Sequence, residues 1–172
     1  MAVAAVPLNT ARVDGPLYKA QASSRGGDLS AWELDYRGIK PMIVPGLLGP
    51  RGIIVERAGQ PPQVVNFTVA PESVDLSKVV DRGEITLVGE DGFGLRIRET
   101  MSFRANGYDV ERVIRVENMG RAPQEATVVI GWSAPVTWPK DVTEKFQGQH
   151  PTRVVRAVNG SVRHEELAKI AD

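Results

Sequence analysis

The feature that most constrains the fold is an alternation of apolar and polar residues over 93–104, FGLRIRETMSFR. Successive side chains of a β-strand point to opposite faces, so a period of two predicts a strand with one wet face. One parity is apolar: Phe93, Leu95, Ile97, Met101 and Phe103. The other parity is polar: Arg96, Arg98, Thr100, Ser102 and Arg104.

A second alternating segment follows the turn Ala105-Asn106-Gly107. Together the two segments predict a long antiparallel hairpin, in which Asn-Gly supplies the positive φ angles of the turn. One face of the second strand would carry Tyr108, Val110, Ile114 and Val116, and the opposite face Asp109, Glu111, Arg115 and Glu117. ATVVIGWS, residues 126–133, also alternates and is predicted to be a third, neighbouring strand.

Strand signals dominate the rest of the chain as well. Shorter candidates are LYKAQA (17–22), WELDY (32–36), GIIVE (52–56), VVNFTV (64–69) and EITLV (84–88). RVVRAV and SVRH are joined by Asn159-Gly160, which predicts a two-residue hairpin turn. Only EELAKIA, 165–171, has a mild helical pattern, and the segment 135–151 contains three prolines and no period, so it is either a loop with a role or a missed element.

The stretch Arg25-Gly26-Gly27-Asp28 separates two predicted strands. Its glycines let the backbone enter conformations that are closed to residues with a Cβ, as a tight connection requires. We expect the Asp28 side chain to accept a hydrogen bond from the nearby backbone. In the strand that follows, Trp32, Leu34 and Tyr36 would line one face.

Chain length, net charge and cysteine content limit the class of protein. A chain of 172 residues is long enough for one sizeable core, so we expect a single domain over 1–172. The net charge is zero, which gives no electrostatic reason to expect nucleic acid as a partner. Cysteine is absent, which excludes disulfides and thiolate chemistry. MAVAAVPL lacks the features of a signal peptide and no apolar stretch approaches about 20 residues, so the chain as given is expected to be soluble.

Three stretches in combination resemble the large periplasmic domain of bacterial YidC-type membrane protein insertases. They are LYKAQASSRGGDLSAWEL, PGLLGPRG and DGFGLRIRETMSFRANGYDVERVIRVENMG, which lie within residues 17–133. The tail, FQGQHPTRVVRAVNGSVRHEELAKIAD, resembles the family only loosely. Relative to the family, the sequence ends before an expected closing strand and amphipathic helix, as an excised fragment or a shortened variant would.

The resemblance implies a fold and a function. The fold would be a twisted, antiparallel, two-sheet β-sandwich of the supersandwich or galactose-mutarotase-like kind, with little helix. The domain would lie on the periplasmic side of the bacterial inner membrane, without the transmembrane parts of the full-length protein. It would be a non-catalytic binding or spacing surface that assists the insertion and folding of membrane proteins. Its implied partners are Sec translocase components and nascent inner-membrane proteins, and no cofactor is implied.

The sequence offers few groups for chemistry. A mutarotase-like enzyme needs an acid and a base across a sugar ring, and the chain has only His150 and His164. Catalysis is therefore the minor alternative, in which the protein binds or epimerises carbohydrate. The two histidines with Asp141 or Glu144 do not match the spacing of a known metal site, so we predict none. A structural β-module of an unrelated envelope assembly is a further alternative.

Two other patterns have both a structural and a functional reading. GEDGFG, 89–94, precedes an alternating strand, which favours a hairpin turn over a phosphate-binding loop. We expect Arg96, Arg98 and Arg104 to form a row neutralised by Glu111 and Glu117 of the partner strand, with an anion contact as the alternative.

The three tryptophans are read by their positions. Trp32 and Trp132 lie among apolar residues of strand faces and are predicted to be core residues. Trp138 lies in the long loop and is the candidate binding residue. A structural lid is the favoured reading for it, ahead of contact with a groove or with lipid headgroups.

Overall fold

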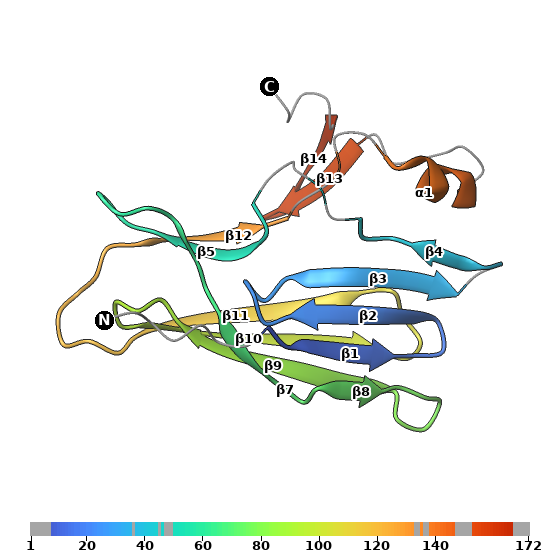
Figure 1. The fold of residues 1–172 in the computed structure, drawn as a ribbon, viewed down its shortest axis with the longest axis horizontal. Coiled ribbons are helices and arrows are strands. Elements are labelled where there is room, and N and C mark those ends of the chain that lie inside the picture. Colours follow the sequence, from blue (N-terminus) through green and yellow to red (C-terminus); the bar gives the residue numbers. More distant parts are fainter. Residues whose placement is uncertain are drawn as a thin grey trace.

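The computed structural model describes residues 8–35, 37–44, 46, 50–132, 135, 138–146 and 153–166. The regular secondary structure of the described residues is almost all strand, which confirms the predicted all-β class with little helix (Figure 1). In chain order the elements are β1 (Thr10–Asp14), β2 (Tyr18–Ser23), β3 (Leu29–Asp35), β4 (Ile39–Pro41), β5 (Gly52–Glu56), β6 (Gln63–Val64), β7 (Phe67–Ala70), β8 (Ser73–Asp75), β9 (Arg82–Glu90), β10 (Leu95–Arg104), β11 (Val110–Asn118), β12 (Thr127–Gly131), α1 (Lys140–Lys145), β13 (Arg153–Val158) and β14 (Ser161–Glu166).

Two large sheets form the sandwich that the sequence predicts. A five-stranded sheet has the order β4-β3-β2-β1-β8, and a four-stranded sheet has the order β11-β10-β9-β7. The sheets overlap in the view of Figure 1, and the core lies between them. Their strands pair antiparallel except β1 and β8, which are parallel. A three-stranded sheet, β12-β5-β6, and the hairpin β13-β14 complete the described structure.

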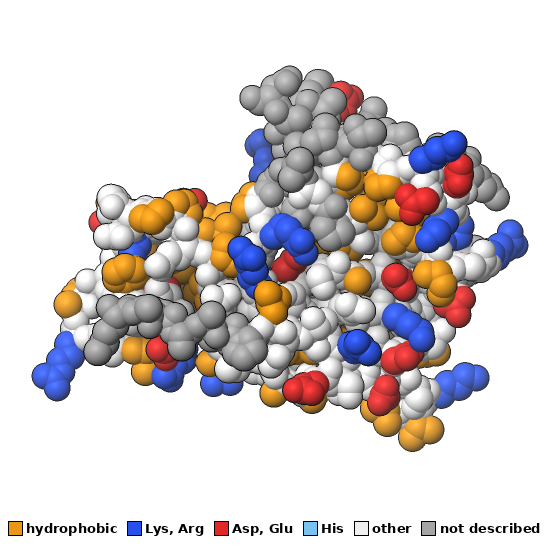
Figure 2. Space-filling model, viewed as in Figure 1, with side chains coloured by type: hydrophobic (Ala, Val, Ile, Leu, Met, Phe, Trp, Pro, Cys, Tyr) orange, Lys and Arg blue, Asp and Glu red, His pale blue; other side chains and the backbone are white. Residues whose placement is uncertain are grey.

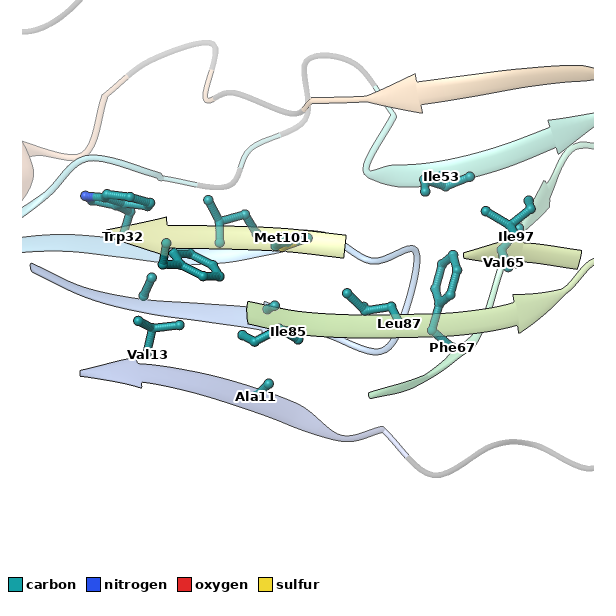
Figure 3. Packing of buried hydrophobic residues seen from close by; sticks show 14 of the residues in the cluster. Ala11, Val13, Trp32, Ile53, Val65, Phe67, Ile85, Leu87, Ile97 and Met101 are labelled. Atoms are coloured by element: carbon teal, nitrogen blue, oxygen red, sulfur yellow. The ribbon is translucent and has the colours of Figure 1, made fainter. Parts of the chain in front are cut away.

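The long strands of the four-stranded sheet carry the centre of the core. As the alternation predicts, Leu95, Ile97, Met101 and Phe103 are at most 6% exposed. At one end they meet the five-stranded sheet, where Met101 lies near Trp32, and at the other end Ile97 lies near Ile53 of the three-stranded sheet (Figure 3). One face of β9 and β10 is therefore covered by two different sheets.

The aromatic end of this core is fixed by Tyr18 and Trp32. Their rings are stacked with centroids 4.3 Å apart, and Trp32 is only 5% exposed, which confirms it as a core residue. The Tyr18 hydroxyl donates a hydrogen bond to the carbonyl of Arg104 at 3.0 Å. Because Arg104 is the last residue of β10, this bond joins the two large sheets at the end of that strand. Tyr36, which was predicted to share a face with Trp32, lies outside the described residues.

The position predicted for residues 126–133 is wrong. β12 pairs with β5 and not with β11, so it belongs to the three-stranded sheet. The apolar parity of this strand extends beyond the core, because Ile130 is 57% and Trp132 is 56% exposed. Trp132 is thus a surface residue, and periodicity alone could not show that the end of the strand overhangs its sheet.

Two turns behave differently from each other. Asn159 and Gly160 have φ angles of 49° and 79°, as the predicted two-residue hairpin turn requires. Asn106 and Gly107 connect β10 to β11 without positive φ, so that part of the prediction is wrong. The second strand of this hairpin starts at Val110, which leaves Tyr108 60% exposed outside it.

Three segments differ from their predicted elements. VVNFTV is divided between β6 and β7, because Val65 and Asn66 carry the chain from the three-stranded to the four-stranded sheet. The predicted helix 165–171 is wrong at its start, where β14 continues to Glu166, and residues 167–171 lie outside the described residues. Phe93 precedes β10 and is 47% exposed.

The segment 135–151 contains an element that the sequence did not predict. α1 spans six residues and buries Val142, while the Lys40 ammonium donates to the carbonyl of Lys145 at 2.6 Å. An isolated helix of this length is marginal in water, so its stability comes from contacts outside it.

No helix in the described residues is long and apolar enough to cross a membrane. One hydrophobic cluster includes residues of the five-stranded, four-stranded and three-stranded sheets. The organisation of residues 1–172 as a single domain stays a prediction.

The two tryptophans on strand faces give the first test. We expect Trp32→Ala to lower the free energy of unfolding by about 3–5 kcal/mol, because it removes a buried ring and leaves a cavity. Trp132→Ala should change it by less than about 0.5 kcal/mol, because this ring is exposed. Urea denaturation monitored by circular dichroism measures both, and a similar loss for the two variants would contradict the assigned burial.

Candidate functional site

The turn Arg25-Gly26-Gly27-Asp28 lies where the three sheets meet. Gly26 and Gly27 have φ angles of 75° and 62°, as predicted for these glycines. The N–H of Gly26 donates to the carbonyl of Val65, and the N–H of Ile53 donates to the carbonyl of Gly26, both at 2.7 Å. The turn that follows β2 thereby binds the edge of the three-stranded sheet.

Asp28 contributes to the same connection through its side chain. Its carboxylate accepts a hydrogen bond from Arg51 Nε at 2.9 Å, and Arg51 directly precedes β5. In the described part of the chain this carboxylate has no bond to the backbone of the turn, so the predicted partner of Asp28 is wrong. The turn's own backbone is held instead by the N–H of Ser23, which donates to the Asp28 carbonyl at 2.8 Å.

Beneath the turn lies a buried ion pair between β10 and β11. Glu99 is 0% exposed, and its Oε1 accepts a hydrogen bond from Arg112 Nε at 2.5 Å. Arg112 also donates from Nη2 to the carbonyl of Gly27 at 3.1 Å. The second carboxylate oxygen, Oε2, is buried and has no partner in the described residues. A Cβ on Gly27 would collide with that oxygen, so glycine is required there for space as well as for φ.

The electrostatics of Glu99 are unusual for a paired carboxylate. Burial raises the pKa of Glu99 above its ordinary value of 4.5, and this effect exceeds the lowering by the Arg112 guanidinium. The negative charge of Asp28 raises the pKa of Glu99 further. Folding therefore disfavours the ionised form, so Glu99 weakens the fold as the pH rises above its ordinary pKa.

The sequence analysis missed this pair, although a signal was present. Glu99 lies on the apolar parity of the 93–104 strand, between Ile97 and Met101, and Arg112 shares the inward face with Val110 and Ile114. A single acidic residue on a buried face, with a single basic residue on the same face of the neighbouring strand, predicts a buried pair. Attention to the two exceptions in the alternation would have found it.

A second buried carboxylate organises the turn between β9 and β10. Asp91 Oδ1 accepts hydrogen bonds from the N–H groups of Phe93 and Leu95, at 2.8 and 2.9 Å. Asp91 Oδ2 accepts from Arg57 Nη2 at 2.5 Å, and Arg57 also binds the Gln124 side chain at 2.9 Å. This confirms GEDGFG as a hairpin turn and attaches it to the three-stranded sheet through the residue that follows β5.

The balance at Asp91 is opposite to that at Glu99. Burial alone would raise the pKa of Asp91, but the hydrogen bonds from Arg57 and from the backbone of Leu95 and Phe93 outweigh it. The pKa of Asp91 is therefore below its ordinary value of 3.8. Asp91 stabilises the fold above that value, and the contribution is lost as the pH falls through the range below it.

The residues considered for catalysis or metal binding do not form a centre in the described structure. His164 is exposed on β14, opposite Val155, and His150 lies outside the described residues. The buried carboxylates Asp91 and Glu99 are each bound to an arginine. Within the described ranges no three or more acidic or histidine side chains are grouped so as to hold a metal ion.

The predicted neutral row of arginines is present only in part. Arg96 lies opposite Glu117, as predicted, and its ion pair is with Glu90 of β9 at 2.9 Å. Arg98 lies opposite Arg115, and Glu111 lies opposite Ser102. The strands pair in a register that the sequence did not specify, so Glu111 does not lie opposite an arginine of the row.

A surface groove of about 690 Å³ borders this row of arginines. It is lined by the three-stranded and the four-stranded sheets, with Gln63, Val64, Thr68, Val88, Phe93 and Arg98 among its residues. Trp138 does not line it. The Trp138 side chain is half-buried, and its indole N–H is shielded without a partner in the described residues, so the binding role of Trp138 stays a prediction.

The strand β12 forms an exposed sheet edge that carries large apolar side chains. This strand is terminal in its sheet and pairs only with β5. Its exposed side chains are Thr127 and Ile130, and the exposed Trp132 follows directly after the strand. Figure 2 shows hydrophobic side chains gathered at the upper left, where Figure 1 draws β5 and β12. We call Ile130, Trp132 and the free side of β12 the β12 edge.

The arrangement is a β-sandwich with buried ion pairs between its strands and with exposed sheet edges. The family model of the YidC periplasmic domain matches residues 45–171, and the chain belongs to this family. The match includes the tail and two of the three resembling stretches, while LYKAQASSRGGDLSAWEL precedes it. No curated protein matches the chain.

The role of the Gly27 position can be separated from its φ angle. Gly59 has a similar φ of 73°, and a Cβ there would meet nothing within 4 Å. We expect Gly59→Ala to cost about 1 kcal/mol of unfolding free energy through backbone strain alone. Gly27→Ala should cost at least about 2 kcal/mol more, because the new methyl group displaces a buried charge. Equal losses in urea denaturation would show that the Glu99 contact is unimportant.

The two buried carboxylates predict opposite pH dependences. Relative to wild type, Asp91→Asn should be destabilised by up to about 3 kcal/mol near pH 7, and the difference should shrink as the pH falls below 3.8. Glu99→Gln should instead gain stability relative to wild type as the pH rises above 4.5, since the unfolded wild-type chain then releases the Glu99 proton more readily than the folded chain does. Unfolding curves from pH 3 to pH 7 measure both trends, and parallel trends would contradict the assignment.

Proposed function

We propose that this chain is a periplasmic accessory domain of a membrane protein insertase, which assists insertion and folding without catalysing a reaction. Membership of the YidC periplasmic domain family supports the setting. The proposed location is the periplasmic side of the inner membrane, and the proposed partners are Sec translocase components and nascent inner-membrane proteins. Within this setting the chain supplies a binding surface, a spacer or both.

The observation that carries the binding role is the β12 edge. A terminal strand offers backbone N–H and C=O groups to an added strand, which is a general mode of peptide recognition. Ile130 and Trp132 are 57% and 56% exposed, so an added segment also meets apolar side chains. Segments of membrane proteins are rich in apolar residues. The edge therefore fits an extended, apolar segment of a client before that segment enters the bilayer.

Strand addition at β12 also explains why the edge carries no protective charge. Exposed edges are commonly blocked by lysine, proline or an inward-pointing charge. β12 has the sequence TVVIG and contains none of these. By contrast, the outer edge of the four-stranded sheet is β11, whose exposed residues include Glu111, Arg115 and Glu117. The uncharged β12 edge therefore has the composition expected of an edge that binds a strand, and the charged β11 edge that of a protected edge.

The test is chemical-shift mapping with a soluble peptide of about twelve residues taken from an inner-membrane protein segment. Binding should shift the amide signals of β12 and β5, and Ile130→Lys should weaken it at least about fivefold, because a lysine blocks the edge. Val155→Lys is the matched control, since Val155 is also 57% exposed but lies on β13. If near-millimolar peptide shifts no signal in β12, only the spacer role remains.

A further inference from the structure

The outer face of the four-stranded sheet carries its charges in rows across the strands. This is the face opposite the core, and its side chains are exposed or half-buried. Residues that pair across strands lie side by side on one face, so the rows cross β9, β10 and β11, except the Arg104 row, which crosses only β9 and β10. Five rows follow one another along β10, centred on Arg96, Arg98, Thr100, Ser102 and Arg104.

Each row has its own charge. The Arg98 row contains Arg115 and no acidic residue, and the Ser102 row contains Glu84 and Glu111 and no basic residue. Between them the Thr100 row, with Thr86 and Val113, is uncharged. At one end, the row Glu90-Arg96-Glu117 is negative overall. At the other end, the row Arg82-Arg104 is positive.

Within the described residues the charges of the Arg98 row and the Ser102 row form no ion pair, unlike Arg96, which pairs with Glu90. Like charges directly opposite each other on a sheet are destabilising. Arg98 and Arg115 nevertheless face each other, and neither forms an ion pair with a described residue. Glu84 accepts a hydrogen bond from the Ser102 hydroxyl at 3.0 Å, and Glu111 forms no ion pair with a described residue. The sheet face thus presents separate bands of positive and negative charge.

Read in opposite directions along β10, the series of charged rows places positive rows against negative rows. If a second copy is placed face to face with its strands antiparallel, the two Thr100 rows coincide at the centre. Each Arg98 row then lies over the partner's Ser102 row, and each Arg96 row lies over the partner's Arg104 row. Rows of opposite net charge then meet at all four outer positions. Strand for strand, Glu90 faces the partner's Arg82 and Arg115 faces the partner's Glu111, while Arg96 faces the partner's Arg104 in a like-charged contact. With the strands parallel, every row would instead meet a copy of itself, and like charges would face each other.

We propose that two copies of this chain associate through the outer faces of their four-stranded sheets, with strands antiparallel and the Arg98–Arg115 pair facing the partner's Glu84 and Glu111. The interface is isologous, as a two-fold dimer requires, because the same surface serves on both copies. It is separate from the β12 edge, so neither proposal depends on the other.

The size of the face sets the expected strength. With strands about 4.8 Å apart and a rise of about 3.3 Å per residue, the face measures about 15 by 30 Å. Two such faces bury roughly 900 Å² in total, which is below the range of stable specific interfaces. The dimer is therefore weak, in the micromolar range or above. Because its complementarity is electrostatic, added salt weakens it.

The ends of the face fit the same arrangement. The groove of about 690 Å³ lies at the Arg96 end and includes the apolar residues Val64, Val88 and Phe93. At the opposite end, the loop before β9 carries Val79 and Val80, which are 92% and 52% exposed. Antiparallel packing brings the Arg104 end of one copy to the Arg96 end of the other. This places the exposed valines near the partner's apolar groove.

The test is sedimentation velocity of the 172-residue chain from about 5 μM to 1 mM, in 50 mM and 500 mM NaCl. Wild type should form a reversible dimer that is weaker at the higher salt concentration. Arg98→Glu/Arg115→Glu and Glu84→Arg/Glu111→Arg should each be monomeric, because like rows then face each other. Arg12→Glu/Arg121→Glu is the matched control, since it changes the net charge equally at exposed positions of other elements and should leave the dimer intact.

Mixing the two reversed variants gives the decisive measurement. The reversed Arg98 row of one variant then faces the reversed Ser102 row of the other, so the mixture should form a heterodimer although neither variant forms a homodimer. This recovery also shows that both variants are folded. The proposal is overturned if wild type stays monomeric at 1 mM and 50 mM NaCl, if the reversed variants dimerise as wild type does, or if their mixture stays monomeric.

Discussion

The structure depends on the contact between the Gly26-Gly27 turn and the Glu99–Arg112 pair. The turn joins the five-stranded sheet to the three-stranded sheet through two backbone hydrogen bonds of 2.7 Å, and the pair belongs to the four-stranded sheet below. Arg112 binds Glu99 and the Gly27 carbonyl together, so one guanidinium connects the sheets. Burying a charge is costly unless it is paired, and here the partner is also what holds the turn in place.

The periodic parts of the fold could be predicted from the sequence, because a single physical rule governs them. Alternation places Leu95, Ile97, Met101 and Phe103 on the buried face, and Asn159-Gly160 satisfies the φ angles of its turn. The parts that failed depend on partners distant in the sequence. The pairing of β12 with β5, the exposure of Trp132 and the register that sets Arg98 opposite Arg115 are decided by packing among three sheets.

For the two proposed binding surfaces, the sequence indicated the general type of surface but not the residues that form it. An exposed sheet edge is expected of any open sandwich, but no local pattern in TVVIG distinguishes an edge strand from a buried one. The charged face has a similar limit, since each strand shows only its own alternation. The rows appear when three strands are aligned, and a shift of one residue in the pairing would erase them.

The parallel pairing of β1 with β8 has a consequence for how the chain acquires its structure. Arg12 pairs with Ser73, and the Gly27 carbonyl accepts a hydrogen bond from Arg112. Essential contacts therefore join residues that are far apart in the sequence. Proteins dominated by such non-local contacts have a high contact order and fold slowly. During synthesis the first two strands emerge well before the residues that cover them. The β1-β2 hairpin must therefore stay unaggregated, with its apolar face exposed, until the residues as far as Arg112 have followed.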